Sequence, residues 1–325
     1  MTPLSLSRVS LLAVLSLAAA AAAADEARDW LMKIERAPRE LNYDGVFVYR
    51  HGERLDTLRI VHKVDAKGVQ ERLTSLNGRP REIVRSAGMV QCYLPDENSM
   101  LIEHNKADGG AFPSLLPMRL SGLAAGYNLR LGKTARIAAR DARLVVIDPK
   151  DNYRYGYRLW ADEGTGLLLK AELFDRAGKP IEQFMFTSLR TGIDIPDEAL
   201  QAQMRPGATM HRDNAEVGEL EKRSFEATKL PPGFHLTTRL VRKLSNRDEK
   251  IEHLLYSDGL ASVSVFIEHM GIKPMKAMKH PTRMGAVHAS MRTIDKHRVT
   301  VVGEVPLDTI TLIADSIKPV VRAIE

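Results

Sequence analysis

Apolar and polar residues alternate with a period of two over most of the chain between residues 43 and 193. The segment YDGVFVYRHGERLDTLRIVHKV, which begins at Tyr43, reads as a strand, a turn containing Gly52 and a second strand. Further alternating runs follow, separated by turn residues such as Asn77-Gly78. About ten consecutive strands are expected, because few connections are long enough to hold a crossover helix. The pattern therefore predicts an antiparallel meander.

Two segments of this region have helical character. Residues 25–37 place Trp30, Leu31 and Ile34 on one helical face, and Pro38 is expected to end the helix. A short second helix is expected from Pro113, and it carries more apolar side chains than a surface helix needs for anchoring. If the sheet curls into an incomplete barrel, these side chains could help to line or plug it.

The pattern changes after residue 193. Residues 194–228 are polar and aperiodic, which predicts a linker with one short helical turn. Residues 229–325 form a second unit with a strand over ASVSVFIE and a final helix that begins at Pro306 and carries Ile310, Ile313 and Ile317. The predicted class is α+β, mainly β. A large half-open antiparallel β-barrel with a helical plug spans residues 25–193, and a smaller α+β domain spans residues 229–325.

The first 24 residues have the composition of a secretory signal peptide. Arg8 precedes an apolar run, and a string of alanines follows that run. No cysteine follows the expected cleavage region, so a bacterial lipoprotein anchor is not expected. The single cysteine, Cys92, cannot form an internal disulfide, and it alternates with Val90 and Leu94 as a small core residue would. An exported, soluble chain is predicted.

The charge balance favours anionic partners. The formal net charge of the whole chain is +6, and loss of Arg8 with the signal peptide would lower it by one. In an exported protein this excess points to lipopolysaccharide phosphates or an acidic polypeptide. The segment NYRYGYRLW interleaves aromatic residues and arginines, but strand alternation explains it, because the tyrosines share one face and the arginines the other. Nucleic acid is not expected as a partner.

Catalytic and metal-binding motifs are not found in the sequence. The chain contains no G-x-S-x-G elbow, no H-E-x-x-H motif and no phosphate-binding loop, and its histidines are scattered. The segment Met275-x-x-Met278-x-His280 could bind Cu(I), but methionines also fill irregular apolar contacts. We therefore expect no catalytic residues, no metal and no cofactor, and an enzyme would need a convergence of side chains that the sequence does not show.

Several motifs carry a resemblance to known families. The segment YGYRLWADEGTGLLLKAELFDRAGKPIEQFMFTSLR resembles the hairpins of the half-open barrels in LolA/LolB-type lipoprotein carriers. LNYDGVFVYRHGERLDTLRIVH, LPPGF, YSDGLASVSVFIE and VTVVGEVP resemble, in this order, the RseB/MucB family over the whole mature chain. Lys229 is a departure, because an aromatic residue often precedes the L-P-x-G-F element in that family.

The resemblance implies a periplasmic negative regulator of a sigma-E (AlgU-type) envelope-stress response. Such a protein would bind the periplasmic domain of a transmembrane anti-sigma factor of the RseA/MucA type and protect it from regulated proteolysis. It would release this partner on sensing lipopolysaccharide or mislocalised lipoprotein. A homodimer is a further expectation from the resemblance alone. The alternative is a soluble periplasmic lipoprotein or lipid carrier that uses the same barrel.

Two sets of candidate site residues follow from alternation and composition. An apolar cavity for acyl chains is assigned to Phe47, Tyr93, Phe112, Leu115, Leu116, Met118, Trp160, Phe174, Phe184 and Phe186. Contacts to the partner or to anionic lipid are assigned to Phe234, Lys273, Met275, Lys276, Met278, Lys279 and Arg283. An ordinary packed core and a solvated loop without a partner remain the respective alternatives.

Overall fold

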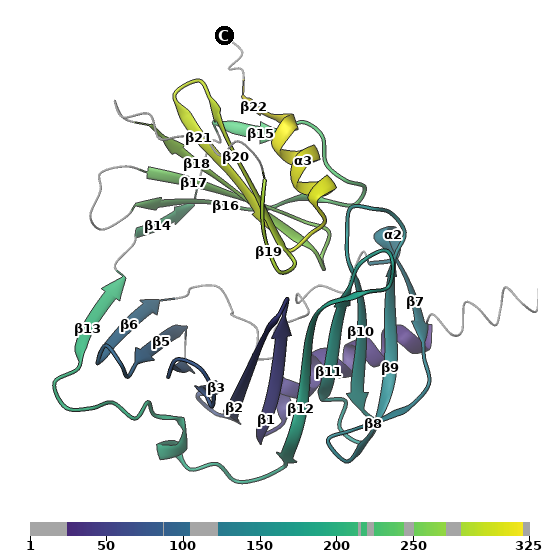
Figure 1. The fold of residues 1–325 in the computed structure, drawn as a ribbon, viewed down its shortest axis with the longest axis vertical. Coiled ribbons are helices and arrows are strands. Elements are labelled where there is room, and N and C mark those ends of the chain that lie inside the picture. The colour runs from purple at the N-terminus through teal and green to yellow at the C-terminus, as the bar shows by residue number, and fades with distance from the viewer. Residues whose placement is uncertain are drawn as a thin grey trace, which may run out of the picture.

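The computed structural model describes residues 25–86, 88–104, 123–213, 216–219, 224–243, 250–270 and 281–320. These residues form a large curled sheet and a smaller sheet that meets it at one end (Figure 1). The predicted class, α+β and mainly β with a half-open N-terminal sheet and a small C-terminal domain, is confirmed. The large sheet does not close, because its two edge strands, β13 and β7, are not paired with each other.

Thirteen strands form the large sheet, in the order β13-β6-β5-β4-β3-β2-β1-β12-β11-β10-β9-β7, with β8 paired to β9. Their bounds are β1 (Tyr43–His51), β2 (Arg54–Asp65), β3 (Gly68–Ser75), β4 (Glu82–Ser86), β5 (Met89–Leu94), β6 (Ser99–His104), β7 (Tyr127–Leu131), β8 (Ala135–Ile137), β9 (Arg140–Pro149), β10 (Gly156–Asp162), β11 (Leu168–Phe174), β12 (Pro180–Thr191) and β13 (Thr209–Asp213). Short hairpin connections make sequence neighbours antiparallel. β1 also pairs with β12, so the first strand lies in the interior of the sheet between β2 and β12.

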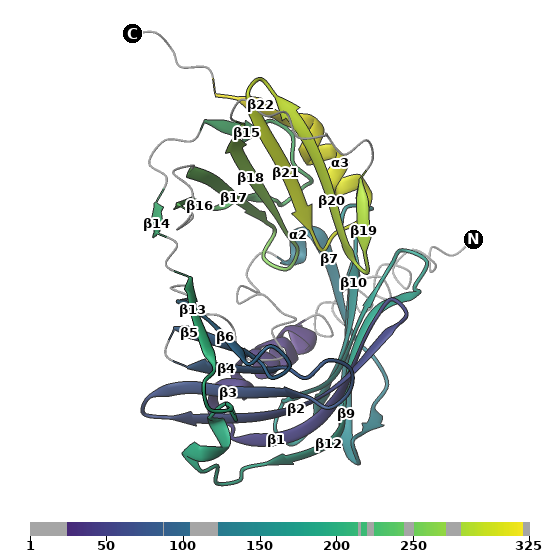
Figure 2. The same cartoon turned by 60° about the vertical axis from the view of Figure 1, so that its left-hand side comes forward.

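The N-terminal helix, residues 25–40, lies in the hollow of the curled sheet (Figure 2). Trp30, Leu31 and Ile34 are buried in one apolar cluster with side chains of the sheet, as the helical periodicity predicted. The predicted end at Pro38 is wrong by two residues. Pro38 removes one backbone hydrogen-bond donor, but the helix continues past it to residue 40, with Ala37 buried in the apolar cluster. The Pro38 carbonyl oxygen lies 2.6 Å from His62 Nε2, which ties the helix to the sheet.

The small domain is a seven-stranded sheet covered by one helix. Its strand order is β14-β16-β17-β18-β21-β20-β19, and β15 pairs with β22 in a separate ribbon. The bounds are β14 (Glu216–Glu219), β15 (Phe225–Ala227), β16 (His235–Lys243), β17 (Lys250–Ser257), β18 (Ser262–His269), β19 (Thr282–Met284), β20 (Val287–Ile294), β21 (His297–Gly303), α3 (Leu307–Ser316) and β22 (Ile317–Pro319). The predicted strand is confirmed as β18, whose Val263, Val265 and Ile267 face the core. The predicted helix is α3, but Ile317 lies beyond it in β22.

Residues 194–228 contain more regular structure than their polar composition predicted. The single turn is present as the 3-10 helix η1 (Asp197–Leu200). However, β13 pairs in parallel with β6 of the large sheet, whereas β14 and β15 belong to the small domain. Even the apolar Met210 in β13 is 54% exposed. This edge strand is held by backbone pairing with β6, so it needs no buried apolar face and shows no apolar alternation. The segment therefore fastens itself to both units.

Candidate functional site

Three of the predicted cavity residues form an aromatic cluster on the concave face of the large sheet. The rings of Phe184 and Phe186 are 5.1 Å apart, and Phe47 lies 5.1 Å from Phe184 and 5.9 Å from Phe186. All three are buried together with the N-terminal helix. In this conformation they pack against one another as core, and an acyl chain would have to displace them to enter between the helix and the sheet.

Trp160 and Phe174 lie on the opposite, outer face. The register pairs Trp160 with Lys170, whereas Leu159 and Ala171 share the concave side with Phe184. Lys170 Nζ covers the Trp160 ring at 4.3 Å, and Arg158 covers the Phe174 ring at 4.2 Å. Trp160 still belongs to the same buried apolar cluster as Phe47, but its ring is on the other side of the sheet, and Phe174 is not part of that cluster.

Tyr93 is also on the outer face. It packs in a small cluster with Met100 and Ile102, against which Ala202 and Ala208 also pack. Its hydroxyl donates to Asn98 Oδ1 at 3.0 Å and accepts from the Arg205 amide at 3.0 Å. These bonds give Tyr93 a local structural role in fixing the chain that leads to β13.

Several predicted site residues lie outside the described residues. They are Phe112, Leu115, Leu116, Met118, Lys273, Met275, Lys276, Met278 and Lys279. The Met275, Met278 and His280 set for Cu(I) lies outside them as well. Of the second predicted set, Arg283 is exposed in β19 and its Nε donates to the Gly285 carbonyl at 2.9 Å. Phe234 is buried in the small-domain core.

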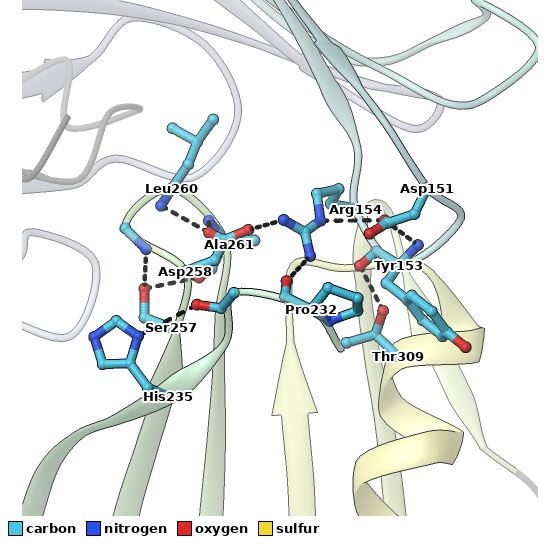
Figure 3. Close-up of polar contacts among 12 residues, drawn as sticks. Asp151, Tyr153, Arg154, Pro232, His235, Ser257, Asp258, Leu260, Ala261 and Thr309 are labelled. Carbon is cyan, nitrogen blue, oxygen red and sulfur yellow. Dashed lines mark hydrogen bonds and ion pairs between the residues drawn. The ribbon is translucent and has the colours of Figure 1, made fainter. Parts of the chain in front are cut away.

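A buried arginine that the sequence pattern did not predict lies between the two domains. Arg154 lies in the loop before β10 (Figure 3). Its side chain is fully buried. Nη1 lies 2.9 Å from Asp258 Oδ2, and Nη2 donates to the Pro232 carbonyl at 2.5 Å. The guanidinium lies 5.3 Å from the rings of both Tyr127 and Phe234. One charge of the large domain is thus enclosed by groups from both units.

The turn at residues 257–261 presents the acidic partner of Arg154. Asp258 Oδ1 accepts the amides of Leu260 at 2.9 Å and Ala261 at 2.7 Å, so the other carboxylate oxygen is free to face the arginine. Arg154 and Asp258 form an ion pair in which Nη1 and Oδ2 are close but are not aligned for a hydrogen bond. Thr309 of α3 donates to the Tyr153 carbonyl at 2.5 Å beside it.

A second contact joins the domains at the turn between β19 and β20. The Ala286 amide donates to Glu182 Oε1 of β12 at 3.1 Å, and the Tyr49 hydroxyl of β1 donates to Glu182 Oε2 at 2.5 Å. Gly285 has a φ of +62°, and a Cβ there would lie 2.5 Å from His51 Nδ1. Only glycine fits this turn without strain and collision.

A cleft of about 750 Å³ opens where the domains meet beside the Arg154 contact. Its lining residues are Asp151, Asn152, Tyr153, Arg176, Thr228, Lys229, Asp308, Thr311, Leu312, Asp315, Ser316 and Lys318. Charged side chains of both signs line it, with no excess of either.

In the part of the chain that the structure describes, no three histidine, cysteine or acidic side chains are placed to hold a metal ion. Nor does any helix in the described ranges have the length and apolar character to cross a bilayer.

Both domains match known family models and proteins. Residues 26–204 match the MucB/RseB N-terminal domain, and residues 219–318 match the MucB/RseB C-terminal domain. The sigma factor AlgU regulatory protein MucB of Pseudomonas aeruginosa is 37% identical over 93% of this chain and 94% of its own length. The sigma-E factor regulatory protein RseB of Salmonella typhimurium is 30% identical over 95% of this chain and 96% of its own.

Solved structures resemble this chain over most of its length. A crystal structure of MucB in complex with MucA(peri) has a TM-score of 0.70 and 34% identity, and the match covers 91% of this chain and 100% of that one. The Pseudomonas aeruginosa MucA/MucB complex gives the same values. A crystal structure of MucB has a TM-score of 0.63 with 32% identity, over 91% of this chain and 98% of that one.

Proposed function

This chain belongs to the MucB/RseB family of sigma-factor regulatory proteins, and on that premise we propose that it binds the periplasmic domain of a transmembrane anti-sigma factor. The observation that carries the proposal is its likeness, over both domains, to MucB in complex with MucA(peri). Residues 1–24 would be a signal peptide that directs the chain to the periplasm and is then removed.

We further propose that the complex shields the anti-sigma factor from the protease that makes the first cut. Two domains in a fixed orientation can contact one partner jointly. The buried Arg154–Asp258 pair and the hydrogen bond from Ala286 to Glu182 support such a fixed orientation. Lys273, Lys276, Lys279 and Arg283 would supply cationic contacts to the partner or to an anionic lipid.

Release of the partner would be triggered by lipopolysaccharide or a mislocalised lipoprotein. The aromatic cluster of Phe47, Phe184 and Phe186 supports this step, because an open sheet with an apolar concave face can accept an acyl chain if these side chains move. The net positive charge would favour the approach of an anionic headgroup.

A protection assay tests the proposal. The periplasmic domain of the anti-sigma factor is incubated with its first protease, with and without this protein, and the rate of cleavage is followed. We expect the protein to slow cleavage and added lipopolysaccharide to restore it. An unchanged cleavage rate with saturating protein would contradict the shielding role, and continued protection with lipopolysaccharide present would contradict the release step.

The second candidate function is a soluble carrier of lipoprotein or lipid. The apolar concave face of the large sheet favours it, because a carrier would need that face and not the small domain. Deletion of residues 220–325 separates the two candidates. A carrier should keep its lipid binding and delivery, whereas a regulator should lose much of its affinity for the anti-sigma factor.

A further inference from the structure

The contact between the β19–β20 turn and the large domain contains a buried carboxylate whose two oxygens serve different domains. Glu182 is 8% exposed. Its Oε2 accepts the hydroxyl of Tyr49 from its own domain, and its Oε1 accepts the amide of Ala286 from the small domain. His51 Nδ1 lies 4.0 Å from Oε1. Separation of the domains would break the bond to Ala286 and admit water to Glu182.

A second carboxyl group lies at the same contact. Glu304 follows β21 and leads into α3, and among the described residues no ion pair to it is formed. Burial, and then the negative charge of Glu182, raise the pKa of Glu304 from 4.5 to about 7. Gly303 pairs with His288 in the β20–β21 ladder, so Glu304, the next residue, lies beside the start of β20 and the β19–β20 turn. Its negative charge also contributes to the raised pKa of Tyr49, Tyr155 and Tyr157 in the large domain.

We propose that Glu182 and Glu304 make this contact an acid-sensitive joint, which holds the two domains together more firmly at acidic than at alkaline pH. When both carboxyl groups are charged they repel each other inside a poorly solvated contact. A proton on Glu304 removes this repulsion. Opening the joint returns Glu304 to water, where its charge is well solvated, so deprotonation favours the open arrangement.

Other titratable and charged groups lie near the joint or act electrostatically on the tyrosines beside it. They are Tyr49, His51, Asp56, Tyr155, Tyr157, Asp175, Asp258, Arg283 and His288. Burial raises the pKa of Tyr155 to about 12, so that tyrosine stays neutral in the relevant range. His288 Nδ1 is engaged with the Val305 carbonyl at 2.8 Å. Arg283 opposes the trend, because it favours nearby carboxylates at any pH.

The size of the effect follows from proton linkage. The closed joint binds the Glu304 proton more tightly than the open joint does. The contribution of this proton to closure is therefore fully present below the ordinary pKa of 4.5 and is lost as pH rises through about 7. Between about pH 5.5 and pH 8 these two values allow the opening equilibrium constant to rise by at most roughly 30-fold. Above about pH 8 the change should level off.

Hydrogen exchange in the unmodified protein measures the joint directly. The Ala286 amide donates across the joint, whereas the Ala227 amide donates to the Tyr256 hydroxyl at 3.0 Å within the small domain and serves as control. After correction for intrinsic exchange, we expect protection at Ala286 to fall by up to about 30-fold from pH 5.5 to pH 8, with protection at Ala227 unchanged. Equal protection of Ala286 at the two pH values would overturn the proposal.

Substitutions then identify the responsible group. Dyes are placed at Lys133→Cys and Lys296→Cys, two exposed turn positions in different domains, in a Cys92→Ser background. Energy transfer should report opening at alkaline pH in this parent, and Glu304→Gln should abolish the pH dependence. His51→Gln, the control, should keep it. A pH response that survives Glu304→Gln, or one lost with His51→Gln alone, would refute the assignment to Glu304.

Discussion

Replacement of Arg154 by methionine tests whether one buried charge couples the two domains. Methionine keeps an unbranched chain between the rings of Tyr127 and Phe234 but removes the cation. Asp258 would then remain buried, 6% exposed, without its counter-ion, and the Pro232 carbonyl would lose its donor.

The expected cost can be worked from these contacts. Removal of one partner from a buried ion pair costs about 3–5 kcal/mol, because the other charge is left uncompensated. Asp258 still accepts two backbone amides through Oδ1, which solvate part of its charge. We therefore expect about 3 kcal/mol from Arg154→Met. Asp258→Asn should cost less, about 1–2 kcal/mol, since the amide oxygen can keep both backbone bonds and Arg154 retains Asp151 at 3.2 Å.

Urea unfolding read by two probes is the assay. Both tryptophans, Trp30 and Trp160, lie in the large domain, so their fluorescence reports that domain, whereas far-ultraviolet circular dichroism reports both. In the parent protein the two curves should coincide. In Arg154→Met the dichroism should show an additional transition at lower urea, as the small domain unfolds alone. Superimposable curves for parent and variant would refute the coupling role of Arg154.

Three further predictions concern other parts of the structure. Gly285→Ala should lower the unfolding free energy by more than the roughly 1–2 kcal/mol cost of a left-handed residue, because its Cβ would also collide with His51. The control Gly52→Ala, with a similar φ of +61° and nothing within 4 Å, should show only the backbone cost. Equal losses of unfolding free energy would contradict the collision with His51. Phe184→Ala should lower the unfolding free energy by about 3–5 kcal/mol, because Phe184 is buried in the aromatic cluster. The control Leu55→Ala, at an exposed position, should lower it by under about 0.5 kcal/mol. Similar losses for the two variants would be inconsistent with a packed aromatic cluster. Simultaneous replacement by serine of the four cations Lys273, Lys276, Lys279 and Arg283 should weaken binding of the anti-sigma factor or lipopolysaccharide and reduce the salt dependence of that binding. The control Lys250→Ser, at an exposed position, should leave binding unchanged. Unchanged affinity of the fourfold variant at low salt would show that these cations are not part of the interface.

Local pattern was sufficient to predict most of the fold. Alternation identifies β18 through Val263, Val265 and Ile267, because a half-buried strand must place every second side chain in the core. The same argument predicted the meander of the large sheet. It could not predict β13, because an exposed edge strand is held by backbone bonds to β6 and needs no apolar face.

The site was less accessible from the sequence. Alternation separates the two faces of a strand but does not say which face is concave, so Trp160 and Phe174 were grouped with Phe47 although they lie on the outer face. Arg154 and Asp258 each fit a local explanation, strand alternation for one and turn chemistry for the other. Their pairing depends on how two domains meet, which no short-range pattern encodes.

Calorimetric titration tests the central claim most directly. The protein without residues 1–24 is titrated with the periplasmic domain of the host's anti-sigma factor, and the titration is repeated with lipopolysaccharide present. The account predicts saturable binding that lipopolysaccharide abolishes. No binding in either condition would contradict it and leave the lipid carrier as the better description.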